Sequence, residues 1–387
     1  MITYSLEKVN HFILQKQHLT EETKNNKIKK ITEDIFGLHT TLAATPFLSL
    51  HSRMNEFTKQ MLINELTKKR TIGKLRCVRR TIYIIPKKML PVAFAATKKM
   101  QWINSDLYDK YFGFSEKKYN EISRKIQGLL GNRGLTTKEI KNEIATMANI
   151  SSIINLMCDQ GLIYRGFPKK GWKSNIHTYY NFNRYFPDIN LNSYKEKDAQ
   201  KILIRKYIKV FGPVTLKDII WWTGFRANEV KNSIEEIKYD LRQIKVDHLD
   251  GELIIDKDDL EILSEISIPK KQVINVLPIL DPLIMGYKQR DRFFEQSKYH
   301  YIYDKSGNAT NSILLNGRII GVWDIDEPYV KMFLLEKVSE RIRRELIDKL
   351  MKVGTFFTDK KVSFKDCKTM IPLDKRTAGS MMKPLKS

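Results

Sequence analysis

The stretch GLHTT (residues 37–41) places an imidazole and two hydroxyl groups between flanks that are otherwise mostly apolar. A neutral imidazole can orient or deprotonate a water molecule, and a threonine hydroxyl can both donate and accept a hydrogen bond. Side chains two residues apart, such as His39 and Thr41, converge only where the chain is extended or turning. The stretch therefore predicts either a water-holding site or a structural junction. At a junction, His39 is hydrogen-bonded and Thr40 or Thr41 caps the next helix.

A second stretch with possible chemistry is ILDPLIMGYKQRDRF (residues 279–293). Asp281-Pro282 is typical of a turn, and Lys288, Arg290 and Arg292 alternate as they would on one face of an extended segment. Such a basic strip is suited to a strand of DNA. The alternative is that Asp281 caps the turn and pairs with one of the two arginines.

Several kinds of enzyme site find no support in the sequence. No P-loop, GxGxxG, nucleophile elbow or HExxH motif occurs, so we expect no metal and no small-molecule cofactor. The three cysteines (Cys77, Cys158 and Cys367) are far apart and favour neither disulfides nor a zinc site. Neither a signal peptide nor an apolar run of about 18 residues is present, so we expect a cytoplasmic protein without a membrane partner.

The charge of the chain indicates its partner. The 387 residues include 68 Lys and Arg against 44 Asp and Glu, which leaves a net charge of +24. Such a surplus concentrates polyanions at the surface, so nucleic acid is the first expected partner. The alternative is a lysine-rich surface that serves only solvation.

The order of predicted elements repeats three times along the chain. Each copy has a helix, a second helix started by Thr or Ser, a third helix, and two β-rich runs joined by a short tip. The first copy has helices near 6–18, 29–39 and 55–69. This order predicts an α+β fold with three tandem winged helix-turn-helix modules and a small C-terminal β domain. The expected units are 1–112, 113–190, 191–268, the β domain 269–345, and a basic C-terminal extension, 346–387.

Local signals support the second and third copies. Thr caps the helix that begins near residue 137, where Glu139 is placed to close a capping box, and the next helix is expected over 150–160. In the third copy, Gly212-Pro213 breaks the chain before a helix started by Thr215. Beyond Pro269 we expect strands in QVINVLPIL, YHYIYD and SILLNGRIIGVWDI, then a helix over about 328–352 and a poorly ordered basic tail.

The two β-rich runs of each copy, with the tip that joins them, form its wing. The wings of the first two copies are basic, whereas the wing of the third copy is acidic. Residues 67–80 and 161–186 contain no acidic side chain, and their cations fit contacts to phosphate. Trp172 in the second wing is suited either to stacking on a base or to packing. Seven carboxylates between Asp247 and Glu261 indicate that the third wing faces away from nucleic acid. The predicted DNA-binding residues are Arg70, Lys74, Arg76, Arg79, Arg80, Arg165, Lys169, Lys170, Lys173, Lys288, Arg290 and Arg292.

Four stretches together resemble the winged-helix DNA-crosslink glycosylase family of the AlkZ and YcaQ type. They are VNHFILQKQHL, FGLHTTLAATPFLSLHSRM, LRCVRRTIYIIPKKMLP, and the pair LDPLIMGYKQRDRF with NGRIIGVWDID. The resemblance covers residues 5 to 325 and keeps the order of the motifs. It implies three winged-helix modules and a small β domain curved around double-stranded DNA.

The family resemblance implies hydrolysis of the N-glycosidic bond of alkylated purines, including N7-alkylguanine adducts and crosslinks. Family members carry Gly-Leu-Gln-apolar-Gln or Gly-Leu-Gln-apolar-Asp where this chain has GLHTT, and the two polar side chains hold the attacking water. The matching positions are His39 and Thr41, so these are the expected catalytic residues. We therefore expect a monomeric, nucleoid-associated DNA repair glycosylase, with a non-catalytic winged-helix DNA-binding or regulatory protein as the alternative.

Overall fold

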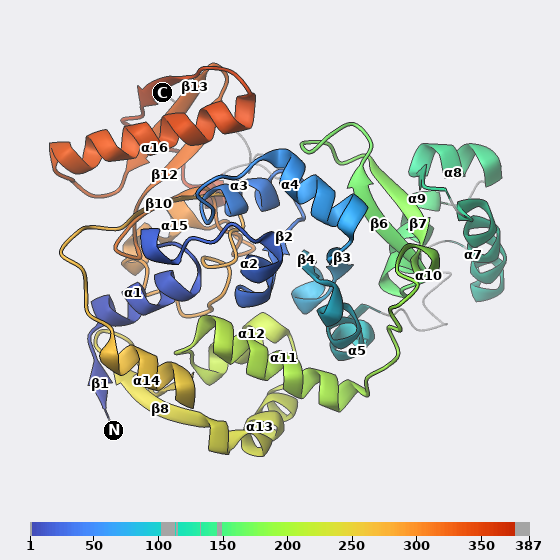
Figure 1. Cartoon of the computed structure of the whole chain (residues 1–387), viewed down its shortest axis with the longest axis horizontal. Coiled ribbons are helices and arrows are strands. Elements are labelled where there is room, and N and C mark those ends of the chain that lie inside the picture. The colour runs from blue at the N-terminus through green and yellow to red at the C-terminus, as the bar shows by residue number, and fades with distance from the viewer. Residues whose placement is uncertain (1, 102–112, 114, 132, 145–148, 376–387) are drawn as a thin grey trace.

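Residues 28–86 form the first of three units that share one order of helices and strands. The computed structural model of the chain describes residues 2–101, 113, 115–131, 133–144 and 149–375 (Figure 1). In the first unit, a helix leads into a short strand, further helices follow, and a hairpin completes a sheet of order β2-β4-β3. Its elements are α2 (Ile28–Asp34), β2 (Leu38–His39), α3 (Thr45–His51), α4 (Lys59–Asn64), a π-helical turn (Glu65–Lys69), β3 (Ile72–Arg76) and β4 (Ile82–Pro86), followed by α5 (Leu90–Gln101).

The second unit repeats this order around a hydrophobic core of its own. Its sheet has the order β5-β7-β6. The predicted capping box is confirmed, because Thr136 N–H donates to Glu139 (2.7 Å) and Glu139 N–H donates to Thr136 Oγ1 (3.3 Å). Its elements are α7 (Glu116–Leu130), β5 (Leu135–Thr136), α8 (Thr137–Ile144), α9 (Ile150–Asp159), β6 (Ile163–Pro168), β7 (His177–Asn181) and α10 (Phe182–Tyr185).

The third unit uses the chain's first residues to extend its sheet. Thr215 caps a helix as predicted, through a capping box with Asp218, and Val214 forms an antiparallel bridge to Ile254. β1 joins the other edge of the hairpin in parallel, so the order is β1-β8-β9. The elements are β1 (Thr3–Tyr4), α11 (Glu196–Phe211), α12 (Leu216–Thr223), α13 (Ala227–Glu236), β8 (Leu241–Val246), β9 (Leu253–Asp256) and α14 (Lys257–Glu265).

The C-terminal part is a five-stranded sheet of order β10-β11-β12-β13-β14, with a long helix packed against it. Trp323 and Met332 from the sheet meet Leu346 and Leu350 from the helix in one buried cluster. The elements are β10 (Ile274–Leu277), α15 (Tyr299–Ile302), β11 (Ser312–Leu315), β12 (Arg318–Asp326), β13 (Tyr329–Leu334), α16 (Glu340–Thr358) and β14 (Ser363–Asp366).

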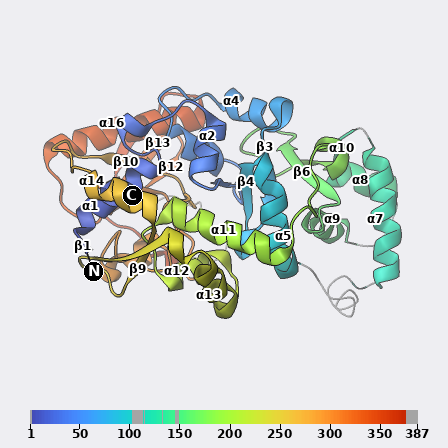
Figure 2. The same ribbon diagram turned by 60° about the horizontal axis from the view of Figure 1, so that its bottom comes forward.

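Two helices connect the units into one body. α11 lies along α5 in both views (Figure 1 and Figure 2), and both helices contribute to the largest hydrophobic core. α1 (Leu6–Lys16) packs against α14, where Lys16 pairs with Asp259. The second unit lies at one end of the molecule (Figure 2).

The prediction for the first unit was wrong in three respects. The helix expected over 29–39 ends at Asp34, because Phe36 and Gly37 adopt positive φ angles of 67° and 138° and turn the chain into β2. α3, which was not expected, then lies between this strand and α4. The 6–18 helix exists as α1 but packs with the third unit instead of opening the first.

Two predictions near the C-terminus were also wrong. YHYIYD begins with one helical turn, α15, where a strand was expected, and only Tyr303 after it is extended and bridges to Ala309. The turn lets Tyr299 stack on Tyr303, with 5.2 Å between ring centroids. The helix expected over 328–352 is preceded by strand β13, because Val330 and Met332 alternate into the core, and α16 begins only at Glu340. The boundary placed at residue 112 and the tail 376–387 lie outside the described residues.

Candidate functional site

His39 reaches its position through a sharp turn that requires glycine. A Cβ atom on Gly37 would lie 2.5 Å from the carbonyl oxygen of Ile84, at a φ angle that L side chains rarely adopt. The turn places His39 opposite Tyr83 in the antiparallel pair of β2 and β4. Thr40 N–H extends this pairing by donating to the carbonyl oxygen of Ile82 (2.8 Å). The backbone of the GLHTT segment is therefore held by the sheet.

The His39 side chain is buried and neutral. Only 2 % of it is exposed, and its ring packs edge-on against Tyr83, with 5.1 Å between centroids. Burial, followed by the positive charge of Arg79, lowers the pKa of His39 to about 3. The imidazole is thus uncharged at neutral pH, far from the value near 6.5 of a solvated histidine.

The two threonines of the segment have different environments. Thr40 is buried, whereas Thr41 is exposed and follows His39 at the distance that places side chains on the same side of an extended chain. The backbone N–H of Thr41 donates to His39 Nδ1 at 3.5 Å. In this tautomer, Nε2 of His39 carries the proton and is a hydrogen-bond donor. Neither threonine caps α3, whose first turn has no side-chain cap.

Arg79 supplies the positive charge beside His39. It lies in the 3₁₀ turn Val78–Arg80 between β3 and β4, where Arg79 and Arg80 both have positive φ angles, 50° and 58°. Its guanidinium stacks on Trp221, 3.8 Å from the ring centroid. Its Nη1 is buried and has no hydrogen-bond partner among the described residues. A strained backbone and an unsatisfied buried donor are features of functional sites, so Arg79 stands out from the other predicted cations.

The sequence did not identify Trp221 and Tyr83 as members of this site. Trp221 is partly buried, with Arg79 on its ring and Arg290 5.4 Å away, whereas its neighbour Trp222 is 2 % exposed and belongs to the core. Burial raises the pKa of Tyr83 to about 12, which keeps its hydroxyl protonated. The adjacent pair Trp221-Trp222 could have indicated that one tryptophan lies outside the core, because two neighbours on a helix cannot both face the core fully.

Arg290 and Arg292 do not form the surface strip that their alternation predicted. They are 4 % and 1 % exposed. Arg290 donates to Tyr299 Oη (2.8 Å) and to the carbonyl of Gly307 (2.9 Å), and Arg292 donates to the carbonyl of Pro213 (3.1 Å). Both guanidinium groups also stack on tyrosine rings. The expected exposed strip is therefore absent at Arg290 and Arg292, whereas Lys288 is exposed.

Asp281 caps its turn as expected but has a different partner. It accepts from the backbone N–H of Leu283 (3.0 Å) and forms a fully buried, bidentate pair with Arg53 at 2.7 and 2.8 Å. Arg53 directly follows α3, so this ion pair joins the first unit to the C-terminal part. The alternative that Asp281 pairs with Arg290 or Arg292 was wrong.

Lys74 also proved to be structural, because it lies at the contact between the first two units. It is 6 % exposed, its Nζ donates to the carbonyl of Gly166 (3.3 Å), and its N–H donates to Tyr164 Oη (3.2 Å). Burial, followed by Arg165, lowers the pKa of Lys74 to about 7. Arg76 pairs nearby with Asp159 at 3.1 Å, at a cavity of about 20 Å³, the space of about one water molecule.

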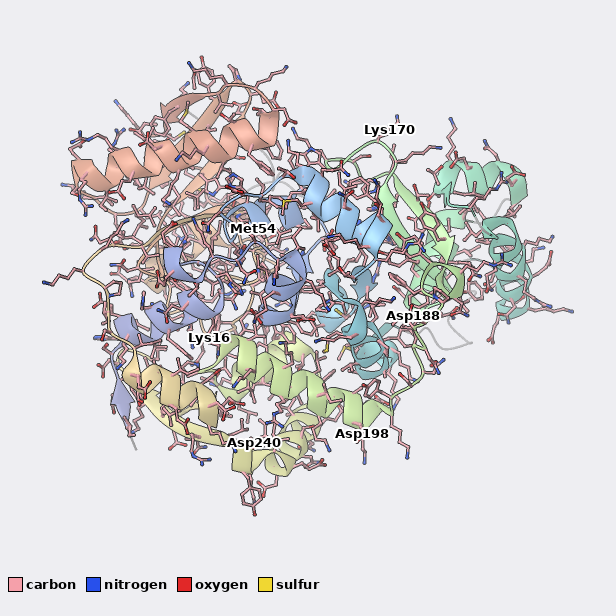
Figure 3. The ribbon with its side chains drawn as sticks, in the orientation of Figure 1. Lys16, Met54, Lys170, Asp188, Asp198 and Asp240 are labelled. Carbon is pink, nitrogen blue, oxygen red and sulfur yellow. The ribbon has the colours of Figure 1, made fainter. Side chains whose placement is uncertain are left out.

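The remaining predicted cations are at least partly exposed. Arg70 stacks on Tyr185 at 4.1 Å, and Arg165 bonds to Asn155. Lys169 pairs with Glu139, and Lys170 lies at the tip of the β6–β7 connection (Figure 3). The exposed members of the predicted set are Arg80, Lys169, Lys170, Lys173 and Lys288.

Trp172 is a packing residue. Its ring lies 5.0 Å from Phe47 of α3 and 5.5 Å from Phe357 of α16, and Lys59 sits over it at 4.5 Å. These contacts fasten the wing of the second unit to α3 and α16.

No group of three or more His, Cys, Asp and Glu side chains in the described part of the chain is arranged to hold a metal ion. None of the described helices is long and apolar enough to cross a membrane.

Comparison with known proteins identifies the family. No curated protein matches the sequence. Among solved structures, the Streptomyces sahachiroi DNA glycosylase AlkZ is similar over 94% of this chain and 100% of its own, with a TM-score of 0.76 and 14% identity, which shows a shared fold. The family model described as DNA glycosylase AlkZ-like matches residues 32–356, a range that includes His39, Arg79 and Trp221. The chain therefore belongs to the AlkZ-like DNA glycosylase family.

Proposed function

We propose that the protein is a monofunctional DNA glycosylase that hydrolyses the N-glycosidic bond of alkylated purines of the N7-alkylguanine type in duplex DNA. The observation that carries this proposal is the family match over residues 32–356, which includes His39 and Thr41. The protein acts as a monomer, in the cytoplasm at the nucleoid, and without a metal or cofactor.

The proposed chemistry requires little acid catalysis. An N7-alkylated guanine is already cationic and leaves without further protonation, so the enzyme has to position water and stabilise an oxocarbenium-like sugar. His39 Nε2–H donates a hydrogen bond to the attacking water, and the Thr41 hydroxyl accepts a hydrogen bond from it, so that a lone pair of the water faces C1′. The C1′–O bond forms as the C1′–N9 bond breaks, the neutral base leaves with the bonding electron pair, and the proton lost by the water passes to solvent. A neutral imidazole is essential to this arrangement, because an imidazolium beside the sugar would repel the developing positive charge. The low pKa of His39 supports this role.

Arg79 is proposed to hold a phosphate next to the damaged nucleotide. Its unsatisfied Nη1 lies in the same neighbourhood as His39, and a guanidinium binds phosphate through charge-assisted hydrogen bonds. Its positive charge also keeps His39 neutral.

The scaffold is proposed to consist of three winged-helix modules, 1–112, 113–190 and 191–268, with a β domain over 269–345 and an extension over 346–387. The repeated element order and the three similar sheet orders support this division. Duplex DNA is held by the exposed members of the predicted set, which are Arg80, Lys169, Lys170, Lys173 and Lys288.

Release of N7-methylguanine from a methylated duplex, after subtraction of spontaneous depurination, tests the proposal. His39→Ala should lower the rate about a hundredfold or more with nearly unchanged DNA affinity, because the loss belongs to the transition state. His39→Gln should retain part of the rate, and Thr41→Val should cost less than His39→Ala. Thr355→Val, at an exposed threonine of α16, is the matched control and should behave as the parent protein does.

Two observations favour the alternative of a non-catalytic DNA-binding protein. His39 is 2 % exposed, and no carboxylate is present in GLHTT. If the parent protein binds several alkylated duplexes but releases no more base than buffer does, the catalytic proposal fails and the binding protein remains.

A further inference from the structure

A polar cavity of about 520 Å³ lies at the end of α3 opposite to GLHTT. It is bounded by the end of α3 and the loop that follows it, by β10, and by one face of α16. Met54, which lines it, is labelled in Figure 3. The volume falls within the range of small-molecule sites, about 300–1,000 Å³.

Three lysines and two glutamates line this cavity, so its side chains carry a net positive charge of one. Lys349 and Lys352 lie three residues apart on α16, and neither forms a hydrogen bond or an ion pair among the described residues. The carboxylates of Glu21 and Glu345 attract Lys349 from a greater distance. Lys24 lies across from them and pairs with Glu21 at 2.9 Å, while Glu56 is an exposed residue of the lining. Burial, followed by the charge of Lys24, lowers the pKa of Lys349. Two unpaired ammonium groups in one recess favour an anion.

The wall of the cavity also offers an unsatisfied acceptor. Asn275 of β10 is 6 % exposed, and its amide nitrogen donates to the carbonyl of Leu19 at 2.7 Å. Its Oδ1 is buried without a hydrogen-bond partner in the described part of the chain. His51 beside it is neutral, because burial and then Lys24 lower its pKa to about 4. A buried acceptor without a partner is costly, so a rotation of the Asn275 side chain that brings Oδ1 to a donor on a ligand in the cavity would remove that cost.

We propose that this cavity binds a phosphate ester that also carries a hydroxyl or amino group. The phosphate lies among Lys24, Lys349 and Lys352, and the hydroxyl or amino group donates to Asn275 Oδ1. The phosphate comes either from a free nucleotide or from the backbone of DNA, and Asn275 favours the free nucleotide, since a phosphodiester alone has no donor. The site does not depend on the proposed glycosylase activity.

Three proteins make the test: the parent, Lys349→Met, and Arg344→Met as the control. Arg344 is an exposed cation on the same helix and lies outside the cavity lining, so its removal changes the net charge by the same amount. AMP and inorganic phosphate are titrated separately by calorimetry, and salt-dependent duplex binding is measured for each protein.

AMP should bind the parent more tightly than inorganic phosphate does, because only AMP can also reach Asn275. Lys349→Met should weaken AMP binding at least tenfold, and Arg344→Met should not. Without ligand, Lys349→Met should melt above the parent protein, since it removes a partly buried ammonium next to the like charges of Lys24 and Lys352. A higher melting temperature of Lys349→Met would show that weaker AMP binding by this variant does not come from a damaged fold.

The remaining outcomes are also decisive. If AMP does not bind but Lys349→Met alone reduces the salt slope of duplex binding by about one unit, the phosphate belongs to DNA and the site stands. If neither ligand binds and the slopes are equal, or if Arg344→Met has the same effect as Lys349→Met, the proposal is overturned. None of these readouts uses base release, so failure of the glycosylase proposal is scored separately.

Discussion

At the scale of single residues, the pKa of His39 changes what the GLHTT segment is expected to do. A solvated imidazole would titrate near pH 6.5 and predict base release that rises through that pH. With a pKa of about 3, His39 is neutral throughout the range in which a duplex is stable. We therefore expect the rate of base release by the parent protein and by His39→Gln to depend on pH in the same way between pH 6 and 7. If the parent protein shows a rise in rate near pH 6 to 7 that His39→Gln lacks, His39 is solvated in the complex with DNA.

The same shift predicts how stability depends on pH. A histidine whose pKa is lowered by folding binds fewer protons in the native than in the unfolded state, so stability is present above pH 6.5 and is lost as pH falls toward 3. For His39→Gln, the free energy of unfolding should fall less steeply below pH 6, by about 1.4 kcal/mol per pH unit, which corresponds to one proton. Urea unfolding between pH 4 and 7 measures this slope. His248→Gln, at an exposed histidine, should keep the parent slope.

The buried pair of Arg53 and Asp281 is a stability determinant between the first unit and the C-terminal part. Asp281→Asn would leave the Arg53 guanidinium buried without its counter-charge, which costs roughly 3–5 kcal/mol in the free energy of unfolding. Glu345→Gln breaks an exposed pair with Arg341 and should cost less than about 1 kcal/mol. Urea denaturation of both variants measures the difference, and equal losses would contradict the structural role of Asp281.

At the scale of elements, the second wing is held by its aromatic residue. Trp172→Ala removes contacts with Phe47 and Phe357 and should cost roughly 2 kcal/mol of stability, because a partly buried indole leaves a cavity that the wing fills only in part. Ile176→Ala, on the same loop and 44 % exposed, should cost much less. A loss of DNA affinity without a loss of stability in Trp172→Ala would instead indicate stacking on a base.

Sequence signals predicted the elements whose information is local. The Thr136–Glu139 capping box and the helix start at Thr215 were both predicted from a few adjacent residues, and the structure has both. The strand β13 was missed because it is a short apolar run, and such a run cannot be distinguished by its sequence pattern from the start of a helix. Its pairing with β12 identifies it as a strand. The burial of Arg292 depends on Pro213, 79 residues earlier in the chain, and no local pattern carries that information.

The candidate site was predictable in its position but not in its environment. The family resemblance indicated His39 and Thr41 by their place in the chain. The neutral state of His39 depends on Tyr83 and Arg79 across the sheet, and the role of Trp221 depends on its contact with Arg79 from a different unit. Such long-range contacts set the electrostatics of a site, and sequence spacing does not encode them.

At the scale of the whole molecule, the net charge of +24 predicts duplex binding that weakens steeply with salt. Replacing Lys169 and Lys170 by Gln should reduce the slope by about one unit, because Glu139 already compensates Lys169. Replacing Asp247 and Asp250 by Asn, at exposed positions of the third unit, should not weaken binding. Fluorescence anisotropy at several salt concentrations measures both, and a slope near zero for the parent would exclude nucleic acid as the partner.

The pairing of β1 with β8 constrains how the chain is made. Tyr4 pairs with Val246, so the first strand emerges from the ribosome about 240 residues before its partner. At roughly 5–20 residues per second, that delay is on the order of 10 to 50 s. During that time α1 also lacks Asp259, which pairs with Lys16 in the finished protein. The third unit is consequently completed by a strand that is synthesised about 240 residues before the hairpin it joins.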